Sequence, residues 1–257
     1  MNASELLRVR LAEIASAVAL LTRFPIPKLA LPAAYGADSV WAYPLVGAMV
    51  GAIGGAVFWT AHWLSCPPAL ASLFALAGMI VATGALHEDG LADFADGLAG
   101  KTREERLVIM RDHQIGTYGV VAILLALAIR ATAIALIATP SAVLAALIAA
   151  DAASRATAVL VMFALPPARQ DGLSASVGQP TARLAAIALL VAFAVGWLVS
   201  SFAVAVLLVL VTGISALAIG FIAQSRLGGQ TGDVLGAAIQ LCQCLALTLL
   251  AIAMVQT

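Results

Sequence analysis

The sequence predicts an all-α fold: a polytopic integral membrane bundle of about seven transmembrane helices, with a cytoplasmic N-terminus. The 257 residues are 63% apolar and only 10% charged, with a mean hydropathy of +1.07, whereas about a quarter of the residues in a soluble domain are charged. The apolar residues form long unbroken runs instead of the alternating pattern of an outer-membrane barrel. This composition excludes a soluble globular domain and a nucleic-acid-binding protein.

The N-terminal segment, residues 1–40, is predicted to be a surface helix followed by a loop. Residues 5–22 have the pattern of an amphipathic helix that lies at the membrane surface. Arg8 and Arg10 precede an apolar stretch that contains Glu13. No small-residue cleavage site follows this stretch, so we do not expect a secretory signal peptide.

Seven later stretches approach the length of about 20 mostly apolar residues that a spanning helix needs. Prolines at 67, 68 and 140 mark tight turns between antiparallel helices. The sequence contains no internal repeat, and we predict a single membrane domain over residues 1–257. The predicted spans are 41–64, 69–86, 119–138, 141–164, 183–199, 202–223 and 234–255.

Seven spans place the connecting loops alternately on two sides, and the charges are distributed unequally between them. Eleven of the thirteen Lys and Arg residues fall on the side of the N-terminal segment and of loops 87–118, 165–182 and 224–233; the other two lie inside spans. Cytoplasmic loops carry the excess of Lys and Arg. We therefore expect the N-terminus in the cytoplasm and Thr257 outside.

The loop 87–118 begins with the densest group of acids, in HEDGLADFADG. Asp89, Asp93 and Asp96 are spaced so that they share one face of a helix. Three carboxylates on one face repel each other unless a cation lies between them, and such oxygen ligands favour Mg²⁺ or Mn²⁺ held jointly with substrate phosphates. We predict a metal site here, with a solvated acidic helix end as the alternative. His87 is a neighbouring candidate for proton transfer.

Two further loops on the same side carry candidate groups. In MRDHQIGTYG, Arg111 and Asp112 precede a glycine turn, which fits either phosphate binding or the positive flank of a span. In GGQTGD, Gly229 permits close backbone approach and Thr231 adds a hydroxyl. Asp233 is a candidate helix cap or metal ligand at the start of the last span.

Charged residues also lie inside or beside the predicted spans. Arg130 lies in one span, and Asp151 and Arg155 lie in the next; the three meet at one depth if these helices pack as a hairpin. Intramembrane charges are costly and are usually paired or functional. We favour a structural role for Arg130 and leave Arg155 open between an ion pair and a phosphate contact. Arg23, in TRFPIP, is open between an interfacial anchor and a phosphate contact.

Taken together, these segments resemble the cobalamin synthase (adenosylcobinamide-GDP ribazoletransferase) family. Two positions depart from the family pattern. At His113 the family usually has a small residue, and at Gln240 or Gln243 the last helix of the family often carries an acid. The matching pieces follow the family order and cover most of the chain: TRFPIP (22–27), WAYPLVGAMVG (41–51), TGALHEDGLADFADGL (83–98), IMRDHQIGTYGV (109–120), SRA (154–156) and GGQTGDVLGA (228–237).

The resemblance implies a multi-pass enzyme of the bacterial inner membrane, with Mg²⁺ as cofactor and a cytoplasmic active face. The implied reaction joins adenosylcobinamide-GDP to α-ribazole or its 5′-phosphate, gives adenosylcobalamin or its 5′-phosphate, and releases GMP. Its chemistry, attack of a ribose hydroxyl on a phosphoryl group, depends mostly on positioning and on charge stabilisation.

The resemblance and the local chemistry together suggest a role for each candidate residue. The expected ligands of Mg²⁺ are Asp89, Asp93 and Asp96. The groups expected to bind substrate are Arg23, Arg111, Arg155, Gly229 and Thr231. The general base is left open among Asp112, Asp233 and His87.

Two other functions compete with this interpretation. A small-molecule transporter would use the layer of Arg130, Asp151 and Arg155, but the outer loops lack the polar residues that a path open to both sides needs. A phosphotransferase of the CDP-alcohol type also uses membrane carboxylates with Mg²⁺, but its AR dipeptide is missing from its place. Besides the substrates, the lipid bilayer is the expected partner; nucleic acid is not. The sequence neither requires nor excludes a homo-oligomer.

Overall fold

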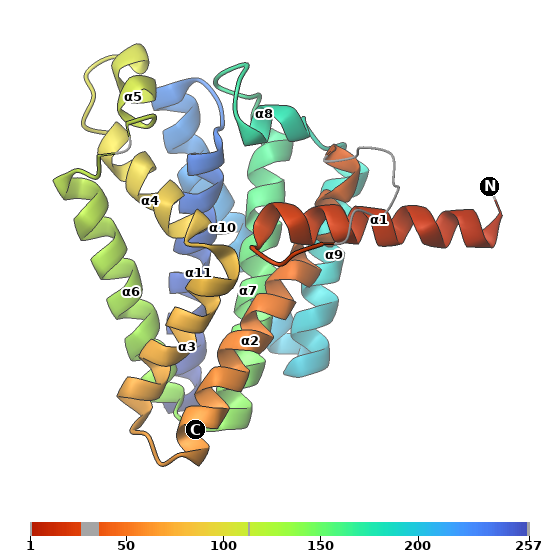
Figure 1. Cartoon of the computed structure of the whole chain (residues 1–257), viewed down its shortest axis with the longest axis vertical. Helices are drawn as coiled ribbons and strands as arrows, with labels where there is room; N and C mark the ends of the chain where they lie inside the picture. The colour runs from red at the N-terminus through yellow and green to blue at the C-terminus, as the bar shows by residue number, and fades with distance from the viewer. Residues whose placement is uncertain (1, 27–35, 113, 256–257) are drawn as a thin grey trace.

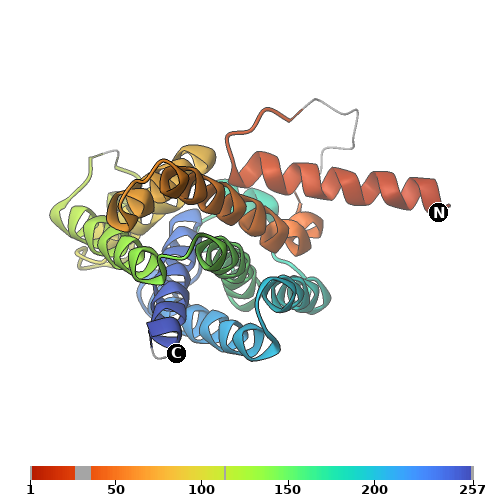
Figure 2. The same ribbon diagram turned by 90° about the horizontal axis from the view of Figure 1, so that it is seen from below.

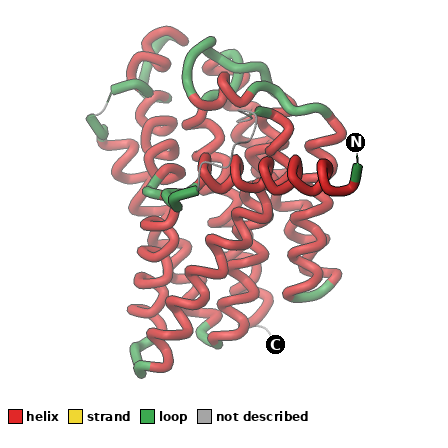
Figure 3. Tube along the Cα trace, turned by 45° about the vertical axis from the view of Figure 1, so that its right-hand side comes forward, coloured by secondary structure: helices red, strands yellow, loops and turns green. Residues whose placement is uncertain are grey.

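The structure, a computed structural model, describes residues 2–26, 36–112 and 114–255. These residues form helices joined by turns and loops, and they contain no β-strand (Figure 3). The predicted all-α fold is therefore confirmed. Three positions used above, Pro27, His113 and Thr257, lie outside the described residues.

Most helices end close to where the apolar runs end. Within the described ranges, six are long and apolar enough to cross a membrane: α2 (extended by η1), α6, α7, α9, α10 and α11. Pro68 and Pro140 start α3 and α7, as the turn signals predict. The bounds are α1 Ala3–Leu21, η1 Ala37–Ala42, α2 Tyr43–Trp63, α3 Pro68–Thr83, α4 Leu86–Gly97, α5 Arg103–Ile109, α6 Thr117–Ile137, α7 Pro140–Ala164, α8 Leu173–Val177, α9 Ala182–Val199, α10 Phe202–Leu227 and α11 Gly232–Val255.

The segment predicted as a straight span at 69–86 is broken, which corrects that prediction. Helix α3 ends at Thr83 because Gly84 and Ala85 both adopt left-handed backbone angles, with φ of 66° and 59°. Helix α4 then leaves at 89° to α3, and the pair counts as a seventh candidate span only when both parts are taken together. The segment 87–118, predicted as a loop, contains most of α4 and the whole of α5.

Helix α7 is the central element of the bundle, surrounded by α2, α9, α10 and α11 (Figure 2). Its closest partner is α2. A Cβ added to Gly47 would overlap the backbone of Asp151, and one added to Gly51 would overlap the backbone of Leu147. Small residues thus let the two helix backbones touch, which is how membrane helices gain packing energy.

The helices outside the six spans determine the shape of the ends. Helix α1 runs crosswise to the bundle and extends beyond it (Figure 1). The backbone N–H of Arg23 donates to the carbonyl of Ala82 at 2.8 Å, so the chain after α1 is attached to the end of α3. Helices α4, α5 and α8 gather at one end of the bundle, the upper end in Figure 1, which we name the charged end.

Candidate active site

The acids of α4 meet the start of α11 at the charged end. A Cβ on Gly90 would lie 3.1 Å from the Cα of Asp233, and one on Gly236 would lie 3.1 Å from the Cα of Gly90. These glycines bring Asp233 beside α4. Asp89 and Asp233 are both near enough to Asp93 for their negative charges to repel its carboxylate. The three carboxylates, with Asp89 exposed and Asp93 half-buried, form what we name the acidic cluster.

The acidic cluster contains a cation that the sequence analysis did not single out. Nη2 of Arg169 lies 3.5 Å from Oδ2 of Asp233. The hydroxyl of Thr231 donates to the same oxygen at 3.1 Å and accepts the N–H of Val234 at 3.3 Å, so Thr231 caps α11. Nη1 of Arg169 is buried and has no hydrogen-bond partner in the described structure. Arg169 therefore has a donor available for an anion.

Arg169 is held in this place by backbone contacts between two loops. The N–H of Ala168 donates to the carbonyl of Gln230 at 2.8 Å, and the N–H of Gln230 donates to the carbonyl of Pro166 at 2.9 Å. A Cβ on Gly229 would overlap that carbonyl of Pro166. The close backbone approach predicted at Gly229 therefore exists, but the group that approaches is the carbonyl of Pro166 in the neighbouring loop.

Asp96 is also near enough to repel the carboxylate of Asp93, but its own oxygens are bound by the start of α6. Its Oδ2 accepts the N–H of Gly116 at 2.7 Å, and its Oδ1 accepts the N–H of Gly119 at 2.9 Å. The buried carboxylate thus caps the N-terminus of α6. Among the described residues, no group of three or more His, Cys, Asp or Glu side chains is arranged to hold a metal ion by itself.

Three other predicted site residues lie outside the acidic cluster. Arg111 pairs with Asp171 at 2.7 Å, and both side chains are exposed. Asp112 is also exposed, and its Oδ1 accepts the N–H of Gln114 at 3.1 Å. Arg23 lines a separate cavity of about 440 Å³ between α1, α3, α4 and α8.

A cavity of about 230 Å³ opens beside the acidic cluster, where α1, α2, α4, α7, α8 and α11 meet. Asp89, Arg169 and Asp233 line it and remain partly accessible. Tyr43 and His87 also line it, but each is only 3% exposed. Oη of Tyr43 and Nε2 of His87 are buried and lack a hydrogen-bond partner within the described parts of the chain. We name this space the reaction cavity.

His87 also lies beside a second polar region, which is buried between α4, α6, α7 and α11. Oε1 of Glu88 accepts a hydrogen bond from Nε2 of Gln240 at 2.9 Å and lies 3.4 Å from both terminal nitrogens of Arg130. Arg130 donates to Oε1 of Gln243 at 2.9 Å. We name this set, with its continuation into α7, the buried network.

The continuation into α7 corrects the predicted hairpin packing and places Arg155. Nε2 of Gln243 donates to Oδ1 of Asp151 at 2.6 Å, and Arg155 donates to the same oxygen. Arg155 is 2% exposed and lies in the buried network, so the geometry gives no support to its predicted contact with a substrate phosphate. Helices α6 and α7 barely touch, and α11 contacts both. Arg130 and Asp151 are therefore connected through Gln243 and not by a hairpin.

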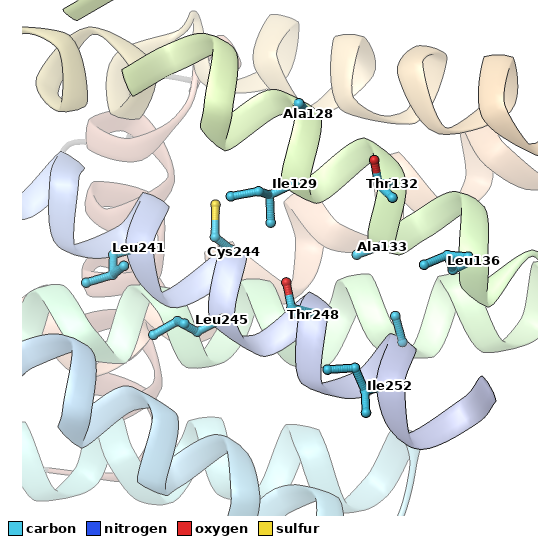
Figure 4. Close-up of a pocket in the computed structure, with 11 residues that line it drawn as sticks. Ala128, Ile129, Thr132, Ala133, Leu136, Leu241, Cys244, Leu245, Thr248 and Ile252 are labelled. Carbon is cyan, nitrogen blue, oxygen red and sulfur yellow. The ribbon is translucent and has the colours of Figure 1, made fainter. Parts of the chain in front are cut away.

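A larger hollow lies elsewhere, a groove of about 910 Å³ between α6 and α11. Ile129, Thr132, Cys244 and Thr248 are among the side chains that line it (Figure 4). None of its described lining residues is charged. Because both helices are candidate spans, we treat it as a bilayer-facing surface and assign no chemistry to it.

The fold and the reaction cavity define a polytopic helical membrane protein with carboxylates and a free guanidinium nitrogen around a partly apolar cavity. The family model of cobalamin-5-phosphate synthase matches residues 13–251. Since this match covers most of the chain, the protein belongs to the cobalamin-5-phosphate synthase family.

Individual relatives agree with this assignment. A protein of Bradyrhizobium diazoefficiens, named adenosylcobinamide-GDP ribazoletransferase, is 45% identical over 241 residues, which cover 91% of each chain. A protein of Mesorhizobium japonicum with the same name is 40% identical over 246 residues, or 95% of this chain and 94% of the relative. No solved structure matches the chain.

Proposed function

We propose that this protein is an adenosylcobinamide-GDP ribazoletransferase, an enzyme that joins adenosylcobinamide-GDP to α-ribazole or its 5′-phosphate and releases GMP. Family membership and the relatives' names support the reaction. The observation that supports its location is the acidic cluster, with Arg169, at the mouth of the reaction cavity. Both the transporter and the CDP-alcohol interpretations are less consistent with this family.

The reaction needs a ribose hydroxyl brought in line with a phosphoryl group whose leaving group is GMP. Phosphoryl transfer depends on positioning and on neutralising the negative charge of the phosphates. Arg169 suits the second task because its Nη1 has no partner in the described structure and guanidinium groups bind phosphate oxygens. Arg23, in the adjoining cavity, is available for a second phosphate.

Asp89 and Asp93, with Asp233, fit Mg²⁺. Asp89 has no side-chain hydrogen bond within the described residues, and repulsion among the three carboxylates would be relieved by a cation. Mg²⁺ is usually bound by one or two carboxylates together with substrate phosphates and water, so a closed cage of three acids is not required. When bound, the ion would supply positive charge to the transferring phosphoryl group. Asp96 is not included because both of its oxygens accept backbone hydrogen bonds.

For the general base, we propose Asp233 or His87 over Asp112. A base must come within hydrogen-bond reach of the hydroxyl it deprotonates. Asp233 and His87 both line the reaction cavity, whereas Asp112 is not among its lining residues. Near-normal turnover by Asp233→Asn or by His87→Asn would exclude that residue as the general base. Asp112→Asn is the matched control and should keep its turnover.

We further propose that the charged end faces the cytoplasm of a bacterium, from its inner membrane. The loops around α5 at this end carry several cations in addition to Arg169, namely Lys101, Arg103, Arg106 and Arg226, which hydrogen bonds bring together. An excess of Lys and Arg marks cytoplasmic loops. Labelling of single cysteines introduced at Lys101 and at Leu64, which lie at opposite ends of the bundle, in intact and in opened cells tests this orientation. Labelling of the Lys101 position from outside would contradict it.

The function itself is tested by GMP release from purified protein in detergent. The reaction contains adenosylcobinamide-GDP, α-ribazole 5′-phosphate and Mg²⁺. We expect equal amounts of GMP and corrinoid product, loss of both with EDTA, and recovery with excess Mg²⁺. Absence of GMP from folded protein would overturn the proposed function. Turnover that survives EDTA would overturn only the Mg²⁺ requirement.

A further inference from the structure

Tyr43, the first residue of α2, contributes a buried hydroxyl to the wall of the reaction cavity. The residue is 3% exposed, and its Oη has no hydrogen-bond partner in the described structure. Buried polar groups are nearly always hydrogen-bonded, since an unpaired one has lost its water and gained nothing. The Tyr43 hydroxyl therefore points to a ligand with a hydrogen-bond acceptor.

The surroundings of Tyr43 restrict the chemistry of that ligand. The inner part of the cavity is lined by apolar side chains that are almost completely buried, among them Ala158 and Met162 of α7, Val177 of α8 and Ile239 of α11. The volume of about 230 Å³ is below the range of about 300–1,000 Å³ typical of whole-ligand sites. This part of the cavity therefore suits an apolar ring system with few polar atoms, and the unpaired groups that face it are the hydroxyl of Tyr43 and Nε2 of His87.

We propose that the inner part of the reaction cavity binds the aromatic base of the acceptor nucleoside, with the Tyr43 hydroxyl donating to its free ring nitrogen. This inference rests on the proposed function. The base of α-ribazole is a fused aromatic ring with two methyl groups; one ring nitrogen carries the ribose and the other has a free lone pair. Hydrocarbon walls match the ring and methyl groups, and the hydroxyl matches that lone pair.

The other parts of the substrates fit this space less well. Guanine carries several donors and acceptors on its edges, and each one left unpaired against Met162 or Val177 would cost binding energy. A corrin macrocycle is far larger than the cavity. The cavity therefore favours the acceptor base over guanine and over the corrin macrocycle.

If the base lies in the inner part of the reaction cavity, the ribose lies next to the acidic cluster. Asp89, Asp233 and Arg169 lie at the accessible side of the cavity, and Tyr43 lies at the buried side. A nucleoside held by its base near Tyr43 would therefore present its ribose hydroxyls to the acidic cluster. Tyr43 thus acts as a specificity-determining residue that orients the acceptor.

The test uses the full-length protein in detergent with two acceptors: α-ribazole and a riboside that has C–H in place of the free ring nitrogen. Wild-type protein should favour α-ribazole in kcat/KM by about 3- to 10-fold, the value of one hydrogen bond. Tyr43→Phe should raise the KM for α-ribazole by about the same factor, leave the KM for adenosylcobinamide-GDP unchanged, and treat the two acceptors alike.

The matched control is Tyr118→Phe, because Tyr118 is 65% exposed on α6; it should retain the wild-type preference. The inference is overturned if Tyr43→Phe keeps the preference for α-ribazole over the C–H riboside, or if Tyr118→Phe loses that preference to the same extent. In either case GMP release by the wild-type protein still supports the proposed function. If wild-type protein releases no GMP, the proposed function fails, and this inference fails with it.

A second variant tests the cavity without relying on Tyr43. Val177→Phe on the short helix α8 should fill the inner part of the cavity and weaken equilibrium binding of radiolabelled α-ribazole at least about tenfold. Binding of adenosylcobinamide-GDP should persist, which shows that the variant is folded. Unchanged α-ribazole binding by this variant would contradict a base site next to α8.

Discussion

Two polar regions share helix α4, and they differ in how their charges are balanced. Asp89 faces the acidic cluster, where carboxylates outnumber their counter-charges and Arg169 keeps a free nitrogen. Glu88, its neighbour in sequence, belongs to the buried network, where acids, arginines and glutamines pair with one another. The comparison shows that residue type alone does not reveal a site: the acidic cluster has excess negative charge at an accessible cavity, whereas the buried network joins opposite charges in the enclosed interior and leaves only single atoms such as Oε2 of Glu88 without a partner among the described residues.

Removing a carboxylate of the acidic cluster should have the largest effect on turnover. We expect Asp89→Asn and Asp93→Asn each to slow GMP release on the order of 100- to 1,000-fold, because charge stabilisation at a reacting phosphate is worth that much. Thermal unfolding should change little, since Asp89 is exposed. A variant at Asp89 with near-normal turnover would exclude it from the site.

Removing a charge from the buried network should instead reduce stability. Arg130→Met leaves Glu88 and Gln243 with fewer partners, and breaking a buried pair costs about 3–5 kcal/mol. Unfolding in detergent should occur at a clearly lower temperature. The double variant Arg130→Met/Glu88→Gln should recover part of the lost unfolding temperature. A double variant that unfolds as early as Arg130→Met alone would argue against the pairing.

Asp96 tests whether every acid of the HEDGLADFADG motif acts in turnover, because its position indicates a role in stability. As a cap of α6, it should contribute about 1–2 kcal/mol to stability, so Asp96→Ala should unfold earlier than Asp112→Ala, an exposed control. Turnover at a temperature where both variants are folded should remain close to wild type. A loss of turnover as large as that of Asp89→Asn would instead restore Asp96 to the metal site.

The smallest effect is expected at Arg111. Its pair with Asp171 is exposed, and exposed pairs contribute about 0–1 kcal/mol. Arg111→Ala should therefore leave the unfolding temperature almost unchanged, and the KM for adenosylcobinamide-GDP should stay within about twofold of wild type. A large rise in that KM would support the phosphate contact that the sequence suggests.

The fold was largely predictable because span lengths and proline turns are local properties. Apolar runs and Pro140 placed α6 and α7 within a few residues. The break after Thr83 was missed because Gly84 and Ala85 lie inside an otherwise continuous apolar run; only the polar start of HEDG signalled it. The packing of α6 against α11 instead of α7 is a long-range property that loop length does not determine.

The site was only partly predictable, for a similar reason. The spacing of Asp89 and Asp93 on one face was visible, but the hydrogen bonds that turn Asp96 toward Gly116 join different helices. Arg169 lay in an ordinary basic loop, and its relation to Asp233 depends on the contacts around Gln230. Tyr43 was not singled out in the sequence, because its unpaired hydroxyl is apparent only where α2 lines the reaction cavity.

The contact between Glu88 and Gln240 also bears on biosynthesis. The two residues are 152 positions apart, and a ribosome delivers the N-terminal part of a chain first. Helix α4 therefore lacks the Gln240 partner of Glu88 and the neighbouring Asp233 until α11 has been translated and inserted. A chain truncated before α11 would keep most of its spans and still lack Asp233, Gln240 and Gln243, so catalytic competence is acquired only at the last step of assembly.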